Sequence, residues 1–164
     1  MKTCVFAGTF DPITKGHAFV VEKCLQLFDK VIIAVGVNVD KKPLFSTDER
    51  IEIIKSAFSG TDRIEIKTFS GMLVDFMKEN DVRFTVRGLR DEDDYKYETS
   101  MARYNFDLDD QVNTLFIPTP VELSYVSSSA IRNLIGLGAD FSEYLPSGAA
   151  VKAKQILKER EGKK

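Results

Sequence analysis

The sequence contains no tryptophan, a single histidine and only two cysteines among its 164 residues. Cys4 and Cys24 lie in separate apolar runs, and neither belongs to a CxxC pair. This pattern argues against a disulfide framework and favours buried thiols in a reducing compartment. We therefore expect a cytoplasmic protein.

The sequence also has neither an excess of positive charge nor a long apolar run. Its net charge of −2 does not give the basic footprint of proteins that bind nucleic acids or membrane surfaces. No run approaches the roughly 20 apolar residues that a membrane span needs. The first apolar run soon meets Asp11 and Lys15, so we expect no signal peptide. Any anionic ligand must be held by a local cluster of positive charge.

What the sequence does contain is an alternation of short apolar runs and helical patterns. With 43% hydrophobic and 29% charged residues, residues 1–164 are expected to form one globular domain. Strands are predicted at residues 3–7, 31–37, 64–69, 82–86 and 114–117. Helices are predicted at residues 18–28, after a Ser46 to Glu49 capping box, at 72–78, along the apolar positions Tyr97, Met101, Tyr104 and Leu108, at 130–135, and after Gly138.

Strands that alternate with helices imply βαβ units. The predicted fold is therefore α/β: a Rossmann-like, doubly wound, five-stranded parallel sheet with helices on both faces and C-terminal helices. Ligands of such sheets bind outside the carboxyl ends of the strands. The loops that follow the predicted strands are residues 8–15, 38–45, 70–73, 87–91 and 118–129.

The first of these loops, GTFDPITKGH, carries the only histidine. Gly8 and Gly16 are expected to allow a sharp turn and a close approach of a ligand to the main chain. The N-terminus of a helix offers free N–H groups and partial positive charge, which suit a phosphate. His17, in the first helical turn, would donate toward a phosphate oxygen. The alternative is an ordinary exposed histidine at a helix start.

Positive and hydroxyl groups follow other predicted strands. Lys41 and Lys42 follow the second, and the segment RGLR (residues 87–90) follows the fourth. The serine run of residues 127–129 precedes a helix, for which one hydroxyl is a natural N-cap. Their convergence at one edge of the sheet predicts a polyphosphate ligand. The acidic run 91–94 is expected in the first turn of a helix, where it complements the helix dipole, and metal ligation is the less favoured alternative.

Five segments together resemble a known family. GTFDPITKGH, KKPLF, SGMLVDF, RGLRDEDDYKYE and SYVSSSAIR occur in this order between Gly8 and Arg132. The set is similar to the bacterial phosphopantetheine adenylyltransferases, in the nucleotidyltransferase superfamily marked by (T/H)xGH. TxGH alone is weakly specific, whereas its combination with RGLR and the serine run is specific. Ala7 and Leu123 depart from the family, which often has proline and an aromatic residue there.

The resemblance implies an enzyme of coenzyme A biosynthesis that transfers the adenylyl group of ATP to 4′-phosphopantetheine, giving dephospho-CoA and pyrophosphate. It implies that phosphopantetheine is bound by Thr9, Lys41, Leu73 and Arg87. It implies that ATP is bound by Thr9, Phe10, His17, Gly88, Leu89, Arg90, Glu98, Leu123, Ser124, Tyr125, Val126, Ser127, Ser128 and Ser129. Mg²⁺ carried with ATP and no metal site on the protein, dephospho-CoA or CoA as a further ligand, and a homohexamer are implied in the same way.

The expected mechanism has no covalent intermediate. Because charge builds up on the α-phosphate oxygens, catalysis should consist of positioning and electrostatic stabilisation, with His17 and Lys41 as the catalytic donors. Two alternatives remain open. Another small nucleotidyltransferase would use CTP or nicotinamide mononucleotide, and a non-catalytic nucleotide sensor would bind ATP without turnover.

Overall fold

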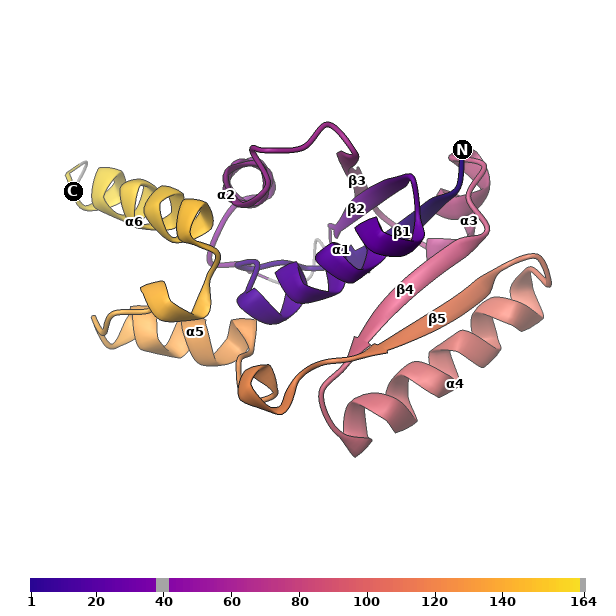
Figure 1. The fold of residues 1–164 in the computed structure, drawn as a ribbon. Helices are drawn as coiled ribbons and strands as arrows, with labels where there is room; N and C mark the ends of the chain where they lie inside the picture. Colours follow the sequence, from indigo (N-terminus) through magenta and orange to yellow (C-terminus); the bar gives the residue numbers. More distant parts are fainter. Residues whose placement is uncertain (38–41, 163–164) are drawn as a thin grey trace.

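The computed structural model describes residues 1–37 and 42–162 as a layered α/β fold (Figure 1). Its strands are β1 (Thr3–Gly8), β2 (Lys30–Gly36), β3 (Ile64–Phe69), β4 (Phe84–Leu89) and β5 (Asn113–Pro118). Its helices are α1 (Lys15–Leu27), α2 (Thr47–Ala57), α3 (Leu73–Glu79), α4 (Glu92–Leu108), α5 (Ser128–Gly136) and α6 (Ser147–Glu161), with short 3₁₀ turns η1 (Val121–Leu123) and η2 (Ser142–Tyr144). No helix in the described ranges is long and apolar enough to cross a membrane.

The strands form one parallel sheet in the order β3-β2-β1-β4-β5. The chain moves outward from β1 through β2 to β3, then returns to the other side of β1 for β4 and β5. The order therefore reverses between β1 and β4, where ligands bind in sheets of this kind. The predicted Rossmann-like, doubly wound sheet is confirmed.

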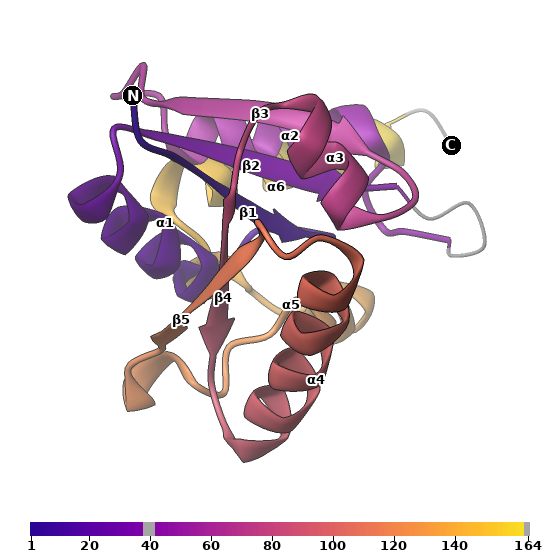
Figure 2. The same cartoon turned by 90° about the vertical axis from the view of Figure 1, so that its right-hand side faces the viewer.

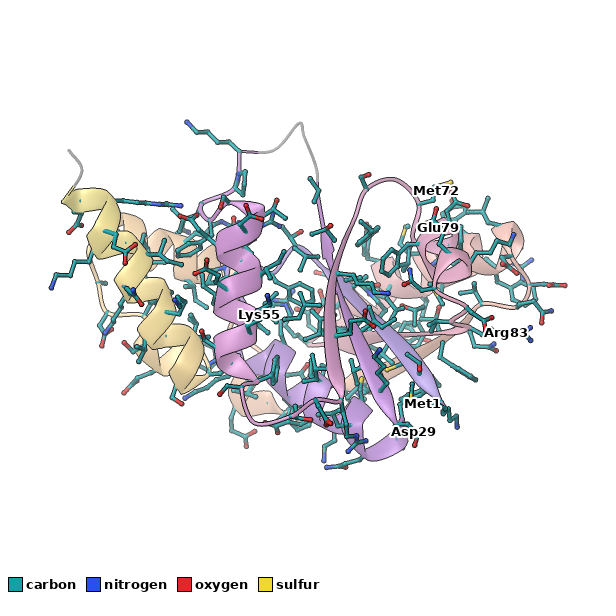
Figure 3. The ribbon with its side chains drawn as sticks, turned by 90° about the horizontal axis from the view of Figure 1, so that it is seen from above. Met1, Asp29, Lys55, Met72, Glu79 and Arg83 are labelled. Carbon is teal, nitrogen blue, oxygen red and sulfur yellow. The ribbon has the colours of Figure 1, made fainter. Side chains whose placement is uncertain are left out.

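Helices cover both faces of the sheet, because alternate residues of each strand point to opposite faces. Cys4 and Phe6 of β1 pack with α1, α2, α5 and α6 in one core cluster. Val5 and Ala7 pack with α3 in a second cluster. Figure 3 shows the two layers: Lys55 of α2 lies on one side of the sheet, while Met72 and Glu79 at the ends of α3 lie on the other.

The fourth strand lies further along the chain than predicted. It was expected at residues 82–86, but the ladder with β5 continues through Arg87, Gly88 and Leu89. Only Arg90 of the RGLR segment follows the strand, so the predicted loop at residues 87–91 is wrong for its first three residues. The segment is polar and contains glycine, and it becomes a strand because β5 supplies hydrogen-bond partners.

Helix α4 forms where it was predicted, but its apolar face does not face a core. No residue of α4 is buried. The side chains of Tyr97, Met101, Tyr104 and Leu108 are exposed on its surface. Figure 2 shows α4 at the end of the sheet formed by β4 and β5, away from α2 and α6. The helical periodicity therefore predicted the element correctly but not its environment.

Candidate active site

A cavity of about 440 Å³ lies where the order of the strands reverses, at the carboxyl ends of β1 and β4. Its walls come from the first loop, the N-termini of α1 and α5, the segment of Lys42 and Pro43, the end of β4, and the first turns of α4. The volume is within the range of roughly 300–1,000 Å³ that is common for small-molecule sites. Loops far apart in the sequence thus meet around one space, as the strand-end rule predicted.

The first loop is fixed by a buried carboxylate. Asp11 is 3% exposed, and its two oxygens accept hydrogen bonds from the N–H groups of Leu44 and Phe45, each at 2.8 Å. The carboxylate therefore links the first loop to the segment before α2. The same loop contains Phe10, which has a φ of 49° and whose buried ring packs edge-on against Phe6 of β1.

Gly8 has a different role from the one expected. A Cβ built on Gly8 would lie 2.9 Å from the ring of Phe10, so this glycine makes room for the ring. The Phe10 ring in turn packs edge-on against the imidazole of His17, with 5.1 Å between ring centroids. Gly8 and Phe10 therefore build the surface on which His17 lies.

His17 is the third residue of α1 and takes part in a capping box with Thr14. The Thr14 N–H donates to His17 Nδ1 at 3.0 Å, and the His17 N–H donates to Thr14 Oγ1 at 3.3 Å. Because a main-chain N–H can only donate, Nδ1 is unprotonated and the proton of the neutral ring is on Nε2. Burial, followed by the positive charges of Arg90 and Arg87, lowers the pKa of His17 to about 4. At neutral pH the ring is an uncharged donor in the wall of the cavity.

The two arginines of the RGLR segment are held by carboxylates of α4. Arg87 donates to both carboxylate oxygens of Glu98, at 2.7 and 2.6 Å. Arg90 forms a similar pair with Asp94, at 2.8 and 3.0 Å, and this pairing lowers the pKa of Asp94. All four side chains line the cavity. The guanidinium groups therefore face the site in fixed positions, and an anionic ligand must share or replace their carboxylate partners.

The serine run begins α5, as predicted. Ser127 is the N-cap, and its hydroxyl accepts from the N–H of Ala130 at 3.1 Å. Ser128 Oγ donates to the carbonyl of Pro12 at 2.8 Å, and Arg132 donates to the carbonyl of Asp11 at 2.8 Å. The start of α5 is thereby tied to the first loop. The N-termini of α1 and α5 both reach the cavity, which suits two phosphate groups.

Two further glycines line the cavity, and only one of them is required by the packing around it. A Cβ on Gly88 would lie 2.9 Å from Val20 Cγ2, so Gly88 allows α1 to pack closely on β4. A Cβ on Gly16 would make only ordinary contacts, the nearest at 3.5 Å from Thr14 Oγ1, and its φ is not in the left-handed region. The sharp turn expected at Gly16 is therefore absent; Thr14 caps the helix there instead.

Many of the predicted site residues line the cavity, and others do not. Those that line it are Thr9, Phe10, His17, Arg87, Gly88, Arg90, Glu98, Val126, Ser127, Ser128 and Ser129. Those of the described residues that do not are Leu73, Leu89, Leu123, Ser124 and Tyr125. Leu73 packs on the opposite core cluster. Lys41, one of the two expected catalytic residues, lies outside the described residues, and its neighbour Lys42 lines the cavity.

The cavity also contains polar residues that the sequence analysis did not assign to the site. They are Asp11, Thr14, Asp94, Thr119 and Arg132. Thr14 has a local signal, because a threonine three residues before a hydrogen-bonding side chain is a capping-box pattern. Thr119 has a weaker signal, because it lies in the loop of residues 118–129 after the last predicted strand but has no motif of its own.

The carboxylates of the cavity are already engaged. Asp11 accepts two main-chain N–H groups, and Asp94 and Glu98 are paired with arginines. Within residues 1–37 and 42–162, no three His, Cys, Asp or Glu residues are arranged to bind a metal ion.

Comparison with known proteins defines the class of this site. The model of the cytidylyltransferase-like family matches residues 5–134, so the chain belongs to that family, and it is a nucleotidyltransferase. Among curated proteins, a phosphopantetheine adenylyltransferase of Heliobacterium modesticaldum is 44% identical over 89% of this chain and 87% of its own length. Another of that name, from Clostridium botulinum, is 43% identical over 89% of both chains. Within the family, the chain belongs to the phosphopantetheine adenylyltransferases, which confirms the resemblance.

A solved structure confirms the fold alone. A bifunctional NMN adenylyltransferase/ADP ribose pyrophosphatase of Francisella tularensis, complexed with AMP and a manganese ion, superimposes with a TM-score of 0.74 at 18% identity. The match covers 96% of this chain and 49% of that one. The chain therefore spans about half the length of this structural neighbour.

Proposed function

We propose that this chain transfers the adenylyl group of ATP to 4′-phosphopantetheine, giving dephospho-CoA and pyrophosphate. The observation that carries the proposal is one cavity that joins two helix N-termini, a neutral histidine donor and two arginines. These groups supply positive potential and hydrogen bonds, which a polyphosphate requires. The names and identities of the curated relatives support the choice of acceptor.

In the proposed reaction, an oxygen of the phosphopantetheine phosphate attacks the α-phosphorus of ATP in line. The bond between the α-phosphorus and the bridging oxygen breaks, and pyrophosphate leaves with the electron pair. Negative charge grows on the nonbridging α oxygens, where His17 Nε2–H donates. Arg90 and the start of α5 hold the β and γ phosphates, while Thr9 and Arg87 orient the attacking phosphate.

Two parts of this proposal come from the family resemblance, and a third follows from the cysteine pattern. Lys41 is proposed as a second donor to the α-phosphate. Mg²⁺ is proposed to enter as part of the MgATP substrate, consistent with carboxylates that are already engaged in the cavity. Catalysis in the cytoplasm is also proposed, in keeping with the free cysteines Cys4 and Cys24.

A homohexamer is proposed on the same basis. The exposed apolar face of α4 supports an interface between subunits, since Tyr97 and Tyr104 are each 62% exposed. Light scattering on the purified chain should give six times the monomer mass. Tyr104→Glu should produce smaller species if this face is buried between subunits, and an unchanged hexamer would place the interface elsewhere.

The reaction is tested by measuring pyrophosphate release from MgATP with and without phosphopantetheine, together with detection of dephospho-CoA by mass spectrometry. Turnover that requires both substrates supports the proposal. Replacement of ATP by CTP, or of the acceptor by nicotinamide mononucleotide, tests the related transferases. Faster turnover with either substitute, or ATP binding without any turnover, would overturn it.

A further inference from the structure

Arg50 is a buried charged residue outside the cavity, and the mechanism above does not use it. It lies in the first turn of α2 and is 3% exposed. Its Nη1 donates to the carbonyl of Thr9 at 2.8 Å and to the carbonyl of Gly36 at 3.2 Å. Its Nη2 donates to Thr47 Oγ1 at 3.0 Å. One guanidinium thus joins the residue after β1 to the last residue of β2.

The place of these contacts matters, because the two strands diverge there into loops that form one wall of the cavity. Thr9 lines the cavity directly. After Gly36 the chain leads to Lys42 and Pro43, which also line it. The hydrogen bonds that the Asp11 carboxylate accepts from the N–H groups of Leu44 and Phe45 join the same two loops a second time. Arg50 and Asp11 therefore fix the distance between the loops at two separate points.

Retaining this charge in the interior carries a penalty. Among the residues that the structure describes, Arg50 Nε is buried and has no hydrogen-bond partner. Burial lowers the pKa of the guanidinium, and the Asp11 carboxylate opposes that effect. A hydrophobic side chain would avoid the unsatisfied donor but would leave the carbonyls of Thr9 and Gly36 without the hydrogen bonds that Arg50 donates. The guanidinium therefore serves these acceptors at the cost of one unsatisfied N–H.

We infer that Arg50 is a positioning residue that sets the spacing of the first two loops, and so aligns the acceptor phosphate with the α-phosphorus of ATP. This inference rests on the proposed function. Arg50 touches neither the cavity nor its contents and acts through the carbonyls of Thr9 and Gly36. Among the described residues, no hydrogen bond joins Arg50 directly to His17, Arg90 or the start of α5, so the effect of Arg50 on the nucleotide should be smaller than its effect on the acceptor phosphate.

The chain offers a matched control in Arg63. Its guanidinium also donates to main-chain carbonyls, those of Leu25, Phe28 and Asp29. Those contacts lie at the amino edge of the sheet, which Met1, Asp29 and Arg83 mark in Figure 3. Arg63 therefore performs the same kind of main-chain bracing at the end remote from the cavity.

The test compares Arg50→Lys with Arg63→Lys. Lysine keeps the charge but has a single ammonium, so it does not span the same acceptors. For Arg50→Lys we expect kcat/KM for phosphopantetheine to fall by about 30- to 100-fold, the loss typical of a small misplacement of reacting groups. The Kd of ATP should stay within about threefold. Arg63→Lys should lower the melting temperature, while kcat/KM for phosphopantetheine and the Kd of ATP stay within about twofold of wild type.

Both variants are assayed below their melting temperatures, with folding checked by circular dichroism. If Arg50→Lys does not fold, Thr47→Val takes its place, because it removes one hydrogen-bond acceptor of the guanidinium. It should also lower kcat/KM for phosphopantetheine. The inference would be overturned if the Arg50 and Arg63 variants had equal kcat/KM for phosphopantetheine. It would also be overturned if Arg50→Lys weakened ATP binding as much as it lowered kcat/KM for phosphopantetheine. An inactive wild type would overturn the proposed function and this inference with it, whereas an active wild type with an unaffected Arg50 variant overturns only the inference.

Discussion

The β1 wall of the cavity is held by hydrogen bonds to main-chain atoms, whereas the β4 wall is held mainly by ion pairs between side chains. On the β1 side, Asp11 and Thr14 contact N–H groups of neighbouring segments. On the β4 side, Arg87 pairs with Glu98 and also donates to the carbonyl of Ala7, whereas Arg90 pairs with Asp94. An arriving phosphate has no reason to displace a main-chain contact, but it can replace a carboxylate as the partner of an arginine.

This difference separates two tasks of the site. The main-chain contacts hold His17 and the first loop in place before any ligand arrives, which is the condition for electrostatic catalysis. The Arg90–Asp94 pair is partly solvated, with side chains 36% and 26% exposed. Such pairs contribute about 0–1 kcal/mol to stability. Replacing the carboxylate by a phosphate as the partner of Arg90 therefore costs little free energy. The β1 wall is therefore rigid, and the β4 wall can exchange partners.

The largest expected effect comes from His17 on the rigid wall. His17→Ala should lower kcat by roughly 10²- to 10³-fold, the usual loss of one preorganised donor, while ATP affinity weakens only modestly because the helix N-termini and arginines remain. His17→Gln should lose as much turnover but keep the helix cap, since glutamine at this position completes a capping box. Steady-state kinetics and thermal melting separate the two roles, and near-normal turnover in either variant would contradict the assignment.

The same comparison changes an expectation about folding. From the sequence, a histidine at a helix start should contribute little to stability. In the structure it accepts the Thr14 N–H and packs against Phe10. His17→Ala should therefore destabilise the protein by about 1 kcal/mol, the usual loss of a helix cap, and His17→Gln by less.

The next effect concerns Arg87 on the exchangeable wall. Arg87→Ala should weaken phosphopantetheine binding by about 2–3 kcal/mol, as expected for the loss of a hydrogen-bonded ion pair with phosphate. ATP binding should change much less. Calorimetry with each ligand measures both constants, and Arg87→Lys is the control because it keeps the charge without the paired N–H donors. Equal losses for the two ligands would remove Arg87 from the acceptor side.

A third effect tests the packing between the two walls. Gly88→Val would force a Cβ to within 2.9 Å of Val20, so α1 must move away from β4. We expect a loss of about 1–3 kcal/mol in the free energy of unfolding, typical of overpacking, with weaker ATP binding as a consequence. Gly16→Ala is the control, because a Cβ there makes only ordinary contacts. Denaturant titration should show the loss for Gly88 alone.

The sequence predicted those features that depend on neighbouring residues. The capping box of Ser46 and Glu49 and the N-cap within the serine run are local patterns, and the structure has both. The convergence of loops followed from strand order in parallel sheets, a general rule. His17 could be selected because the only histidine stood beside a strand end and a helix start.

The remaining features depend on contacts between distant segments. The end of β4 at Leu89 is set by pairing with β5. The space beside Gly8 and Gly88 is filled by Phe10 and Val20, which no local pattern shows. Arg50 looks like any charged residue of an amphipathic helix until the fold brings Thr9 and Gly36 to it.

The smallest expected effect is the pH dependence of stability that His17 contributes. Its pKa is lowered from 6.5 to about 4 by burial and then by Arg90 and Arg87, so the folded state favours the neutral ring. The stabilisation from neutral His17 is fully present above 6.5, the pKa of histidine in the unfolded chain. It is lost as the pH falls from 6.5 toward 4. Between about pH 7.5 and 4.5, wild type should lose roughly 2–4 °C more in melting temperature than His17→Gln, which does not titrate. Equal losses in the two proteins would mean that Nδ1 can be protonated without breaking its contact with Thr14. The assignment of His17 as a neutral donor would then be wrong.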